Sequence, residues 1–158
     1  MTQAANLAAL GSNVNSSGQT SLTAGVSGVL PIANGGTNTS TAPTFSAYFN
    51  GDTTLTSNTW TKLPMDTEEW DTASCYDTSL YRFTPNVAGY YSVEGSFYPY
   101  GTVGTVTRMM VYIFKNGNGH KAGNYVPTFQ SGQGIAVAHT MVYMNGTTDY
   151  IELDRKST

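Results

Sequence analysis

Few residues in this chain could carry out acid–base or nucleophilic chemistry, because it contains two histidines and one cysteine. A cysteine nucleophile needs a histidine and an electropositive environment, and the sequence near Cys75 supplies neither. A lone cysteine also excludes an intrachain disulfide, so we expect Cys75 to be a small buried residue. No motif places a serine, a histidine and an acid together, and no H-x-x-H or C-x-x-C spacing occurs. We therefore expect that the protein is not an enzyme.

The two histidines lie in different surroundings. His139 shares one face of an alternating segment with apolar residues and is predicted to be a hydrogen-bonded residue of the core or of an interface. His120 lies in the glycine-rich stretch GNGHKAG, which is predicted to be a solvent-facing turn.

One acidic cluster offers oxygen ligands of the kind that calcium prefers, but no loop motif fixes their positions. We expect a solvated loop and no cofactor, with a calcium ion as the alternative. The cluster contains Asp66, Glu68, Glu69, Asp71 and Asp77.

A group of aromatic residues lies near predicted turns, where exposed rings could stack on sugars. The alternative is that these rings pack at an interface between subunits or close the end of the β-structure. The candidates for contact with a ligand are Trp70, Tyr98, Tyr100 and Tyr125, and Tyr76 belongs to the same group of aromatic residues.

The composition narrows the classes of partner. The 158 residues carry a net charge of −3, and 11% of them are charged, against roughly 25% in an ordinary soluble domain. A mildly acidic chain with seven basic residues has no electrostatic footprint for nucleic acid. No apolar run reaches the roughly 20 residues of a membrane-spanning helix, and the N-terminus lacks the pattern of a signal peptide. We expect a soluble protein made in a cytosol.

The chain divides into two parts of different character. The first 51 residues contain no charged residue and no histidine, and the first aromatic residue is Phe45. Such a segment buries little apolar surface by itself, so residues 1–44 are predicted to form an extended attachment arm that neighbouring chains order. Ala4–Leu10 is compatible with two helical turns inside this arm. The candidate attachment residues are Leu7, Leu10, Val14, Leu22, Val26, Leu30, Pro31 and Ile32.

Residues 45–158 are predicted to form an all-β head, because strand and turn patterns replace helical periodicity there. Residues 87–97 alternate between apolar and polar side chains, which is typical of a half-buried antiparallel strand. Residues 108–115 are apolar on both faces, as in a strand buried between a sheet and a neighbouring subunit. Further strands are predicted at 45–50, 134–144 and 149–153, with hairpin turns at Asn116-Gly117 and Asn145-Gly146.

Four motifs of the head, in order along the chain, resemble the complement C1q globular-head family. They are KLPMDTEEWDT at 62–72, FTPNVAGYYSVEGSF at 83–97, IFKNG at 113–117 and DYIEL at 149–153. The resemblance covers roughly residues 45–153 and implies a homotrimeric jelly-roll β-sandwich of the C1q/tumour necrosis factor type, used for binding. For the trimer interface or core it implies Phe45, Phe49, Tyr91, Val93, Phe97, Val111, Ile113, His139, Met141 and Tyr143.

The resemblance has one departure. The family closes with a further strand that carries an F-x-G-x-L/I pattern, and no such pattern follows DYIEL in this sequence. An unpaired internal strand edge is costly when buried. We therefore expect that the arm, in particular Ser21–Ile32, or a neighbouring chain supplies the missing strand.

The arm carries a second resemblance. LPIANGGT at 30–37 is similar to the L-P-x-x-N-G-G-T motif at shaft-to-head junctions of bacteriophage tail fibres, and NLAALGSNVNSSG looks like the start of short phage fibre or head-decoration proteins. A flexible Gly/Ser linker is the alternative interpretation.

Together the two resemblances imply a structural virion protein of a tailed phage, assembled in the host cytoplasm. Its partners would be further copies of itself and the major capsid protein or another virion protein, and its role would be capsid decoration, cementing or a head fibre. One alternative is the receptor-binding tip of a short tail fibre, which recognises a host surface glycan or protein. Another is a free bacterial adhesin or lectin-like module.

Overall fold

The computed structural model describes residue 11 and residues 14–19, 42–54, 56, 58–98, 108–127 and 134–158. The chain forms two compact units, Met1–Thr41 and Ala42–Thr158. The second unit is called the head below.

The described part of the first unit is a turn centred on Asn15. The Asn15 Oδ1 atom accepts hydrogen bonds from the backbone N–H groups of Ser17 and Gln19, and Gly18 has a φ of 77° that suits glycine. Val14 is half-buried next to this turn. The helical turns predicted at 4–10 lie outside the described residues, as do the candidate attachment residues Leu7, Leu10, Leu22, Val26, Leu30, Pro31 and Ile32.

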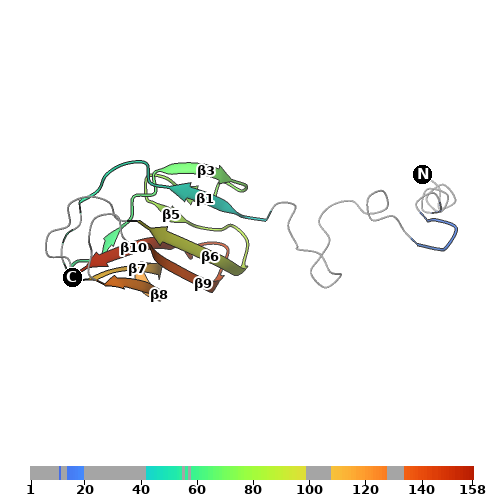
Figure 1. Ribbon diagram of the computed structural model, residues 1–158. Helices are drawn as coiled ribbons and strands as arrows, with labels where there is room; N and C mark the ends of the chain where they lie inside the picture. Colours follow the sequence, from blue (N-terminus) through green and yellow to red (C-terminus); the bar gives the residue numbers. More distant parts are fainter. Residues whose placement is uncertain are drawn as a thin grey trace. The chain divides into compact units, whose positions relative to one another are not determined.

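The head is built from antiparallel sheets, so the predicted all-β class is confirmed (Figure 1). Its strands are β1 (Phe45–Tyr48), β2 (Thr61–Lys62), β3 (Thr67–Asp71), β4 (Tyr76–Asp77), β5 (Arg82–Phe83), β6 (Gly89–Phe97), β7 (Arg108–Lys115), β8 (Asn118–Pro127), β9 (Ala136–Met144) and β10 (Ile151–Ser157). They form three sheets: β1 with β3, β6 with β9, and β4-β5-β10-β7-β8 with β2 also on β10.

The largest sheet is centred on β10, which has neighbours on both of its sides. β10 pairs with β7 along its length, from Ile151 opposite Lys115 to Ser157 opposite Met109. On its other side it pairs with β2 and β5. The strand predicted at 149–153 therefore exists but lies two residues later at its start and runs four residues further. Asp154 and Arg155, which follow the predicted strand, pair with β7 on one side and with β2 on the other.

The β6–β9 sheet follows the predicted alternation. All nine residues of β6 pair with β9, from Gly89 opposite Met144 to Phe97 opposite Ala136. Half-buried and exposed residues alternate along β6, with Tyr91, Val93 and Phe97 facing inward. The small β1–β3 sheet contains a bulge between Ser46 and Ala47.

The two Asn-Gly turns behave differently. Asn116 and Gly117 have φ of 52° and 74°, as a two-residue hairpin requires, and they connect the paired strands β7 and β8 as predicted. Asn145-Gly146 also forms a turn, with a φ of 73° at Gly146. The predicted hairpin is wrong there, because β9 pairs with β6 whereas β10 pairs with β7.

A side-chain cap explains why the second turn crosses from one sheet to another. Asn145 Oδ1 accepts hydrogen bonds from the N–H groups of Thr147, Thr148 and Asp149. This cap satisfies the backbone of a wider turn, so the two strands need not pair with each other.

The stretch GNGHKAG is also different from the prediction: Gly117 belongs to the hairpin turn, but the residues after it lie in β8. Its glycines fit an exposed strand that approaches its neighbours closely. A side chain at Gly119 would touch the Tyr112 ring, and one at Gly123 would collide with the carbonyl oxygen of Val137. His120 is exposed on this strand.

The core lies between the layers formed by the β6–β9 sheet and the β10-centred sheet. Ring contacts extend it from β1 to β6: Phe83 stacks on Phe45, with 4.4 Å between the ring centres, and meets Tyr91 edge to face at 5.8 Å. The buried hydrophobic side chains are Leu63, Cys75, Phe83, Met109, Val111, Ile113, Val126, Ala136, Ala138, Val142, Met144 and Ile151.

Candidate functional site

The residues best suited to chemistry come from separate elements of the head: Cys75 lies between β3 and β4, His120 on β8 and His139 on β9. Cys75 is buried, as predicted, and its thiol donates to the Ala73 carbonyl at 3.4 Å. Burial raises the pKa of this thiol, which opposes formation of the reactive thiolate.

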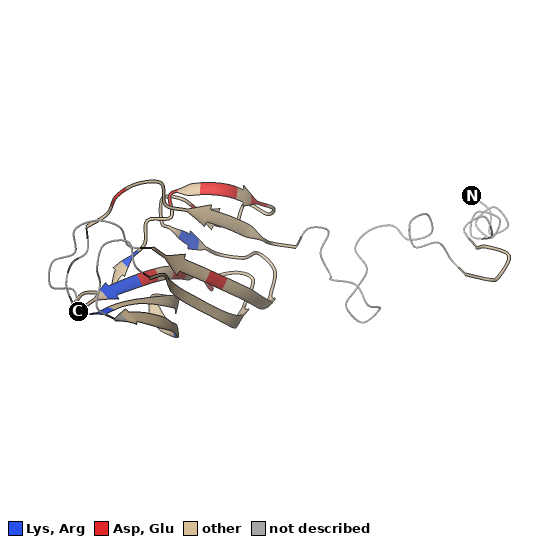
Figure 2. Cartoon of the chain, viewed as in Figure 1, with Lys and Arg blue, Asp and Glu red and all other residues tan. Residues whose placement is uncertain are grey.

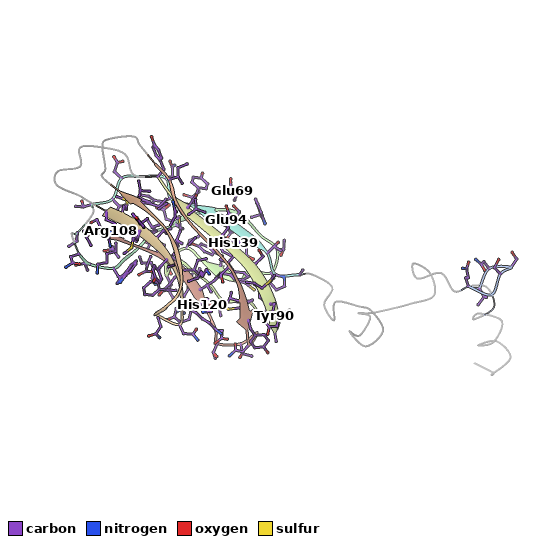
Figure 3. All side chains as sticks on the ribbon, turned by 60° about the horizontal axis from the view of Figure 1, so that its bottom comes forward. Glu69, Tyr90, Glu94, Arg108, His120 and His139 are labelled. Atoms are coloured by element: carbon purple, nitrogen blue, oxygen red, sulfur yellow. The ribbon has the colours of Figure 1, made fainter. Side chains whose placement is uncertain are left out.

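His139 lies on an open sheet surface. Its Nε2 is 3.1 Å from the Ser92 hydroxyl oxygen across the β6–β9 pair, and Glu94 is its cross-strand neighbour. Figure 3 shows His139 and Glu94 close together on this sheet. A serine nucleophile also needs a closed pocket and donors for the oxyanion, which the outer surface of a sheet does not offer.

The acidic cluster is used for local structure. The carboxylate of Asp71 accepts hydrogen bonds from the N–H groups of Ala73 and Tyr76 at 3.1 Å and 2.6 Å. Asp77 accepts bonds from the Ser79 hydroxyl and N–H and from the Leu80 N–H, and these bonds lower the pKa of Asp77. In the described part of the chain, no three such side chains come together in a way that could hold a metal ion.

The candidate ligand-facing aromatics are spread over the head. Trp70 lies on β3, Tyr125 on β8 and Tyr98 directly after β6, and all three are exposed. The Arg108 guanidinium lies 5.4 Å from the centre of the Tyr125 ring. Tyr100 is outside the described residues. These residues come from separate elements, and the described contacts do not join them into one aromatic platform.

A patch of exposed apolar side chains covers the outward surface of the β6–β9 pair, which we call the outer β6–β9 face. The exposed fractions are 75% for Tyr90, 63% for Met141, 48% for Tyr143 and 37% for Val137. The Tyr90 and Tyr143 rings pack edge to face, 5.4 Å apart. Glu94 is the one charged residue on these two strands, as Figure 2 shows. A row of large apolar side chains in water is typical of an interaction surface.

The residues predicted for the trimer interface or core fall into two groups. Val111 and Ile113 are buried in the core, and Phe45, Phe49, Tyr91, Val93 and Phe97 are partly buried. His139, Met141 and Tyr143 lie on the outer β6–β9 face. The sequence placed His139 among apolar neighbours, but the face that it occupies is exposed in the single chain.

A second surface is a cleft of about 930 Å³ between β1 and β6, which we call the β1–β6 groove. Its walls are Phe45, Ala47 and Tyr48 of β1 and Val93 to Phe97 of β6. Buried or partly buried apolar residues form its floor: Leu63, Ile113, Ile151 and Leu153. Gly95 lets β6 lie directly against the floor, because a side chain at this position would overlap Leu153.

Charged residues lie along β10, and one of them, Glu152, lines this groove. Glu152 forms an ion pair with Lys62, whose Nζ also donates to the Leu80 carbonyl. The neighbouring Asp154 is buried, and desolvation, with a smaller effect of Glu152, raises the pKa of Asp154 to about 6.

Arg155 is fully buried, with an exposed fraction of 0%. Its Nη2 donates to the Thr53 hydroxyl and the Thr54 carbonyl, and its guanidinium lies 5.2 Å from the centre of the Phe97 ring. Its Nε and Nη1 have no hydrogen-bond acceptor among the described residues. Burial lowers the pKa of this guanidinium.

The comparisons with known proteins add no relative: no protein-family model matches the chain, and no curated protein matches it. Among the described residues there is no helix of the length and hydropathy that a membrane span needs.

Proposed function

We propose that this protein is a structural component of a tailed-phage virion, a homotrimer with a jelly-roll head of the C1q type and an N-terminal attachment arm. The arm binds the major capsid protein or another virion protein, and the heads project outward as a capsid decoration, cement or head-fibre protein. The motifs of the head and of the arm support this proposal, and the layered antiparallel sheets are compatible with a jelly roll.

The outer β6–β9 face is the observation that carries the proposal. It presents Tyr90, Val137, Met141 and Tyr143 to solvent, with Glu94 as its one charged residue. Covering such a face with an identical copy removes apolar area from water and closes a symmetric assembly. A role in binding and assembly therefore accounts for a surface that a monomer would expose at a cost in solubility.

The oligomeric state tests this part of the proposal. Light scattering coupled to gel filtration should give three times the chain mass of 16.9 kDa. Met141→Asp places a charge in the centre of the outer β6–β9 face and should yield the mass of one chain. His120→Asp, at an exposed position of β8, is the matched control and should keep the trimeric mass. A Met141→Asp protein that remains trimeric would rule out this face as the interface.

The position on the particle tests the virion role. Cryo-imaging of purified particles should show many copies distributed over the shell. A few copies at the tail would instead favour the receptor-binding tip, for which the exposed rings of Trp70, Tyr98 and Tyr125 offer surfaces for sugar stacking. Complete absence from particles would contradict both roles.

A further inference from the structure

We propose that the β1–β6 groove accepts a β-strand from the arm of a neighbouring copy, and that residues 20–27 are this strand. The inference rests on the proposed homotrimer, which supplies the neighbour.

The walls of the groove are strand edges that have no partners among the described residues. Within the described residues β1 pairs with β3 alone and β6 with β9 alone, and no backbone hydrogen bond joins β1 to β6. The remaining edge of each strand offers N–H and C=O groups that need partners when water is removed. In Figure 1 the arrows of β1 and β6 point the same way, so one inserted strand can run antiparallel to both.

The floor of the groove suits an extended peptide segment better than a compact small molecule. Leu63, Ile113, Ile151 and Leu153 present a continuous apolar surface under the two edges. An extended segment places every second side chain on this floor and bonds with both edges at once, as in strand addition to a sheet. A small molecule filling the 930 Å³ would leave both rows of backbone groups unpaired.

The charges around the groove favour a segment without acidic residues. Every charged residue that lines it is a carboxylate, namely Asp52, Glu94 and Glu152, and Glu152 already has Lys62 as its partner. An acidic strand would be repelled, whereas an uncharged strand brings no charge that must be desolvated.

Arg155 marks one end of the groove as incomplete. Its guanidinium contacts Thr53 and Phe97, which both line the groove. Its Nε and Nη1 have no acceptor among the described residues although the side chain is fully buried, and buried donors are rarely left without partners in a finished fold. This end of the fold is therefore incomplete within the described residues of a single chain.

Residues 20–27, TSLTAGVS, have the sequence that this site needs. Leu22, Ala24 and Val26 alternate with small or polar residues, and none of the first 51 residues is charged. These residues lie outside the described part of the chain. Residues 28–41, which link them to the head, can span about 45 Å when extended, enough to reach an adjacent head.

A neighbouring copy is the favoured donor because β6 belongs to both surfaces. The same strand forms a wall of the groove and half of the outer β6–β9 face. A copy that covers this face therefore lies next to the groove, and exchange of a strand between identical chains requires no new interface.

Photo-crosslinking of the full-length protein tests the inference. A benzoylphenylalanine at position 26 is activated in trimers assembled from a mixture of ¹⁵N-labelled and unlabelled chains. Mass spectrometry should find crosslinks to residues 43–53 or 89–98, and about half of the crosslinked peptides in a 1:1 mixture should pair a labelled with an unlabelled chain. Exclusively same-isotope pairs would overturn donation by a neighbour, and crosslinks elsewhere would overturn the inference entirely.

Hydrogen exchange gives a second measurement with a matched pair of variants. Val26→Asp should accelerate exchange of amides in β1 and β6 by at least tenfold, whereas Ser27→Asp, on the opposite side of the same strand, should change it less than twofold. Equal effects of the two variants would contradict strand insertion. The mass of each sample separates this result from the proposed function. A trimer whose β1 and β6 amides exchange without protection would contradict strand insertion alone. A monomeric full-length protein would contradict the proposed homotrimer.

Discussion

Strands of different sheets lie side by side at two places in the head, which we call seams: the β8–β9 seam and the β1–β6 groove. The two seams are built in opposite ways. At the β8–β9 seam, the Asn124 side chain makes hydrogen bonds of the kind that a neighbouring strand would make. Its Nδ2 donates to the Ile135 carbonyl at 3.2 Å, and its Oδ1 accepts from the Val137 N–H at 2.6 Å. Gly123 allows the close approach that this requires. At the β1–β6 groove, no hydrogen bond crosses between the two strands among the described residues.

The difference shows that one side chain is enough to close a seam when a glycine permits contact. The β1–β6 groove has an apolar floor and a backbone edge on each side, and a single side chain would leave most N–H and C=O groups of the two edges without partners. It needs a further strand. The closed seam is therefore a property of one chain, and the open seam is where we expect partners to act.

The largest effect should come from breaking the closed seam. Gly123→Val would push a side chain into the Val137 carbonyl and the Val111 side chain. We expect a loss of about 3 kcal/mol or more in the free energy of unfolding, measured by urea denaturation. Gly89→Ala is the control, because nothing lies within 4 Å of the added methyl group. Similar losses in both variants would show that the seam is not special.

A change in β10, away from both seams, should shift global stability. The pKa of Asp154 is raised to about 6 in the folded state, above its ordinary 3.8, so the folded protein favours the protonated acid. Stability from this residue is therefore full below about pH 4 and falls as the pH rises to 6. Asp154→Asn should raise the free energy of unfolding at pH 7 by on the order of 2 kcal/mol and flatten its dependence between pH 4 and 6.

The Asp154→Asn variant also sharpens the comparison between the seams. The substitution touches neither seam. Amide exchange at the groove edges and in the core should therefore change together with global stability, and the ratio of the two exchange rates should stay the same. Urea titrations at pH 4 and pH 7 provide the measurement. A variant that is less stable at pH 7 would mean that the Asp154 carboxylate has a favourable partner when ionised.

A smaller effect is expected from opening the closed seam by removing its hydrogen bonds alone. Asn124→Ala removes both bonds to β9 at an exposed position, which should cost about 1 kcal/mol. Amide exchange at Val137 should accelerate, while Lys121→Ala, on the exposed surface of the same strand, should leave it unchanged. An unchanged Val137 amide in Asn124→Ala would contradict the role assigned to this side chain.

Local sequence patterns correctly predicted those parts of the head whose structure depends on neighbouring residues in the sequence. The alternation in 87–97 gave the correct faces of β6, and Asn116-Gly117 gave a true hairpin, because both positions need a positive φ. The same dipeptide at 145–146 misled, since its cap connects strands of different sheets. That choice depends on distant partners, which no short window of sequence contains.

The elements that the sequence did not predict have one physical reason in common: contacts with other strands determine them. Glycines near His120 suggested a turn, yet they make room for neighbouring side chains and backbone along β8. The predicted strand stopped at Leu153, but pairing with β7 extends it through the polar residues Asp154, Arg155 and Lys156. For the candidate surfaces, the resemblance placed Met141 and Tyr143 at the trimer interface or in the core, and the mass measurement tests the interface. One face of β9 belongs to the core, and the structure places these two residues on its opposite, exposed face.

The unpaired edges of β1 and β6 also affect how long a solitary chain survives. Two strand edges that have no partner among the described residues, beside an apolar floor, form a template on which other chains can add strands in the wrong register. For the proposed trimer we therefore expect dissociation and aggregation to compete, which makes unfolding irreversible. The lifetime of the folded protein should then depend on scan rate and shorten on dilution, and a single melting temperature would describe it poorly.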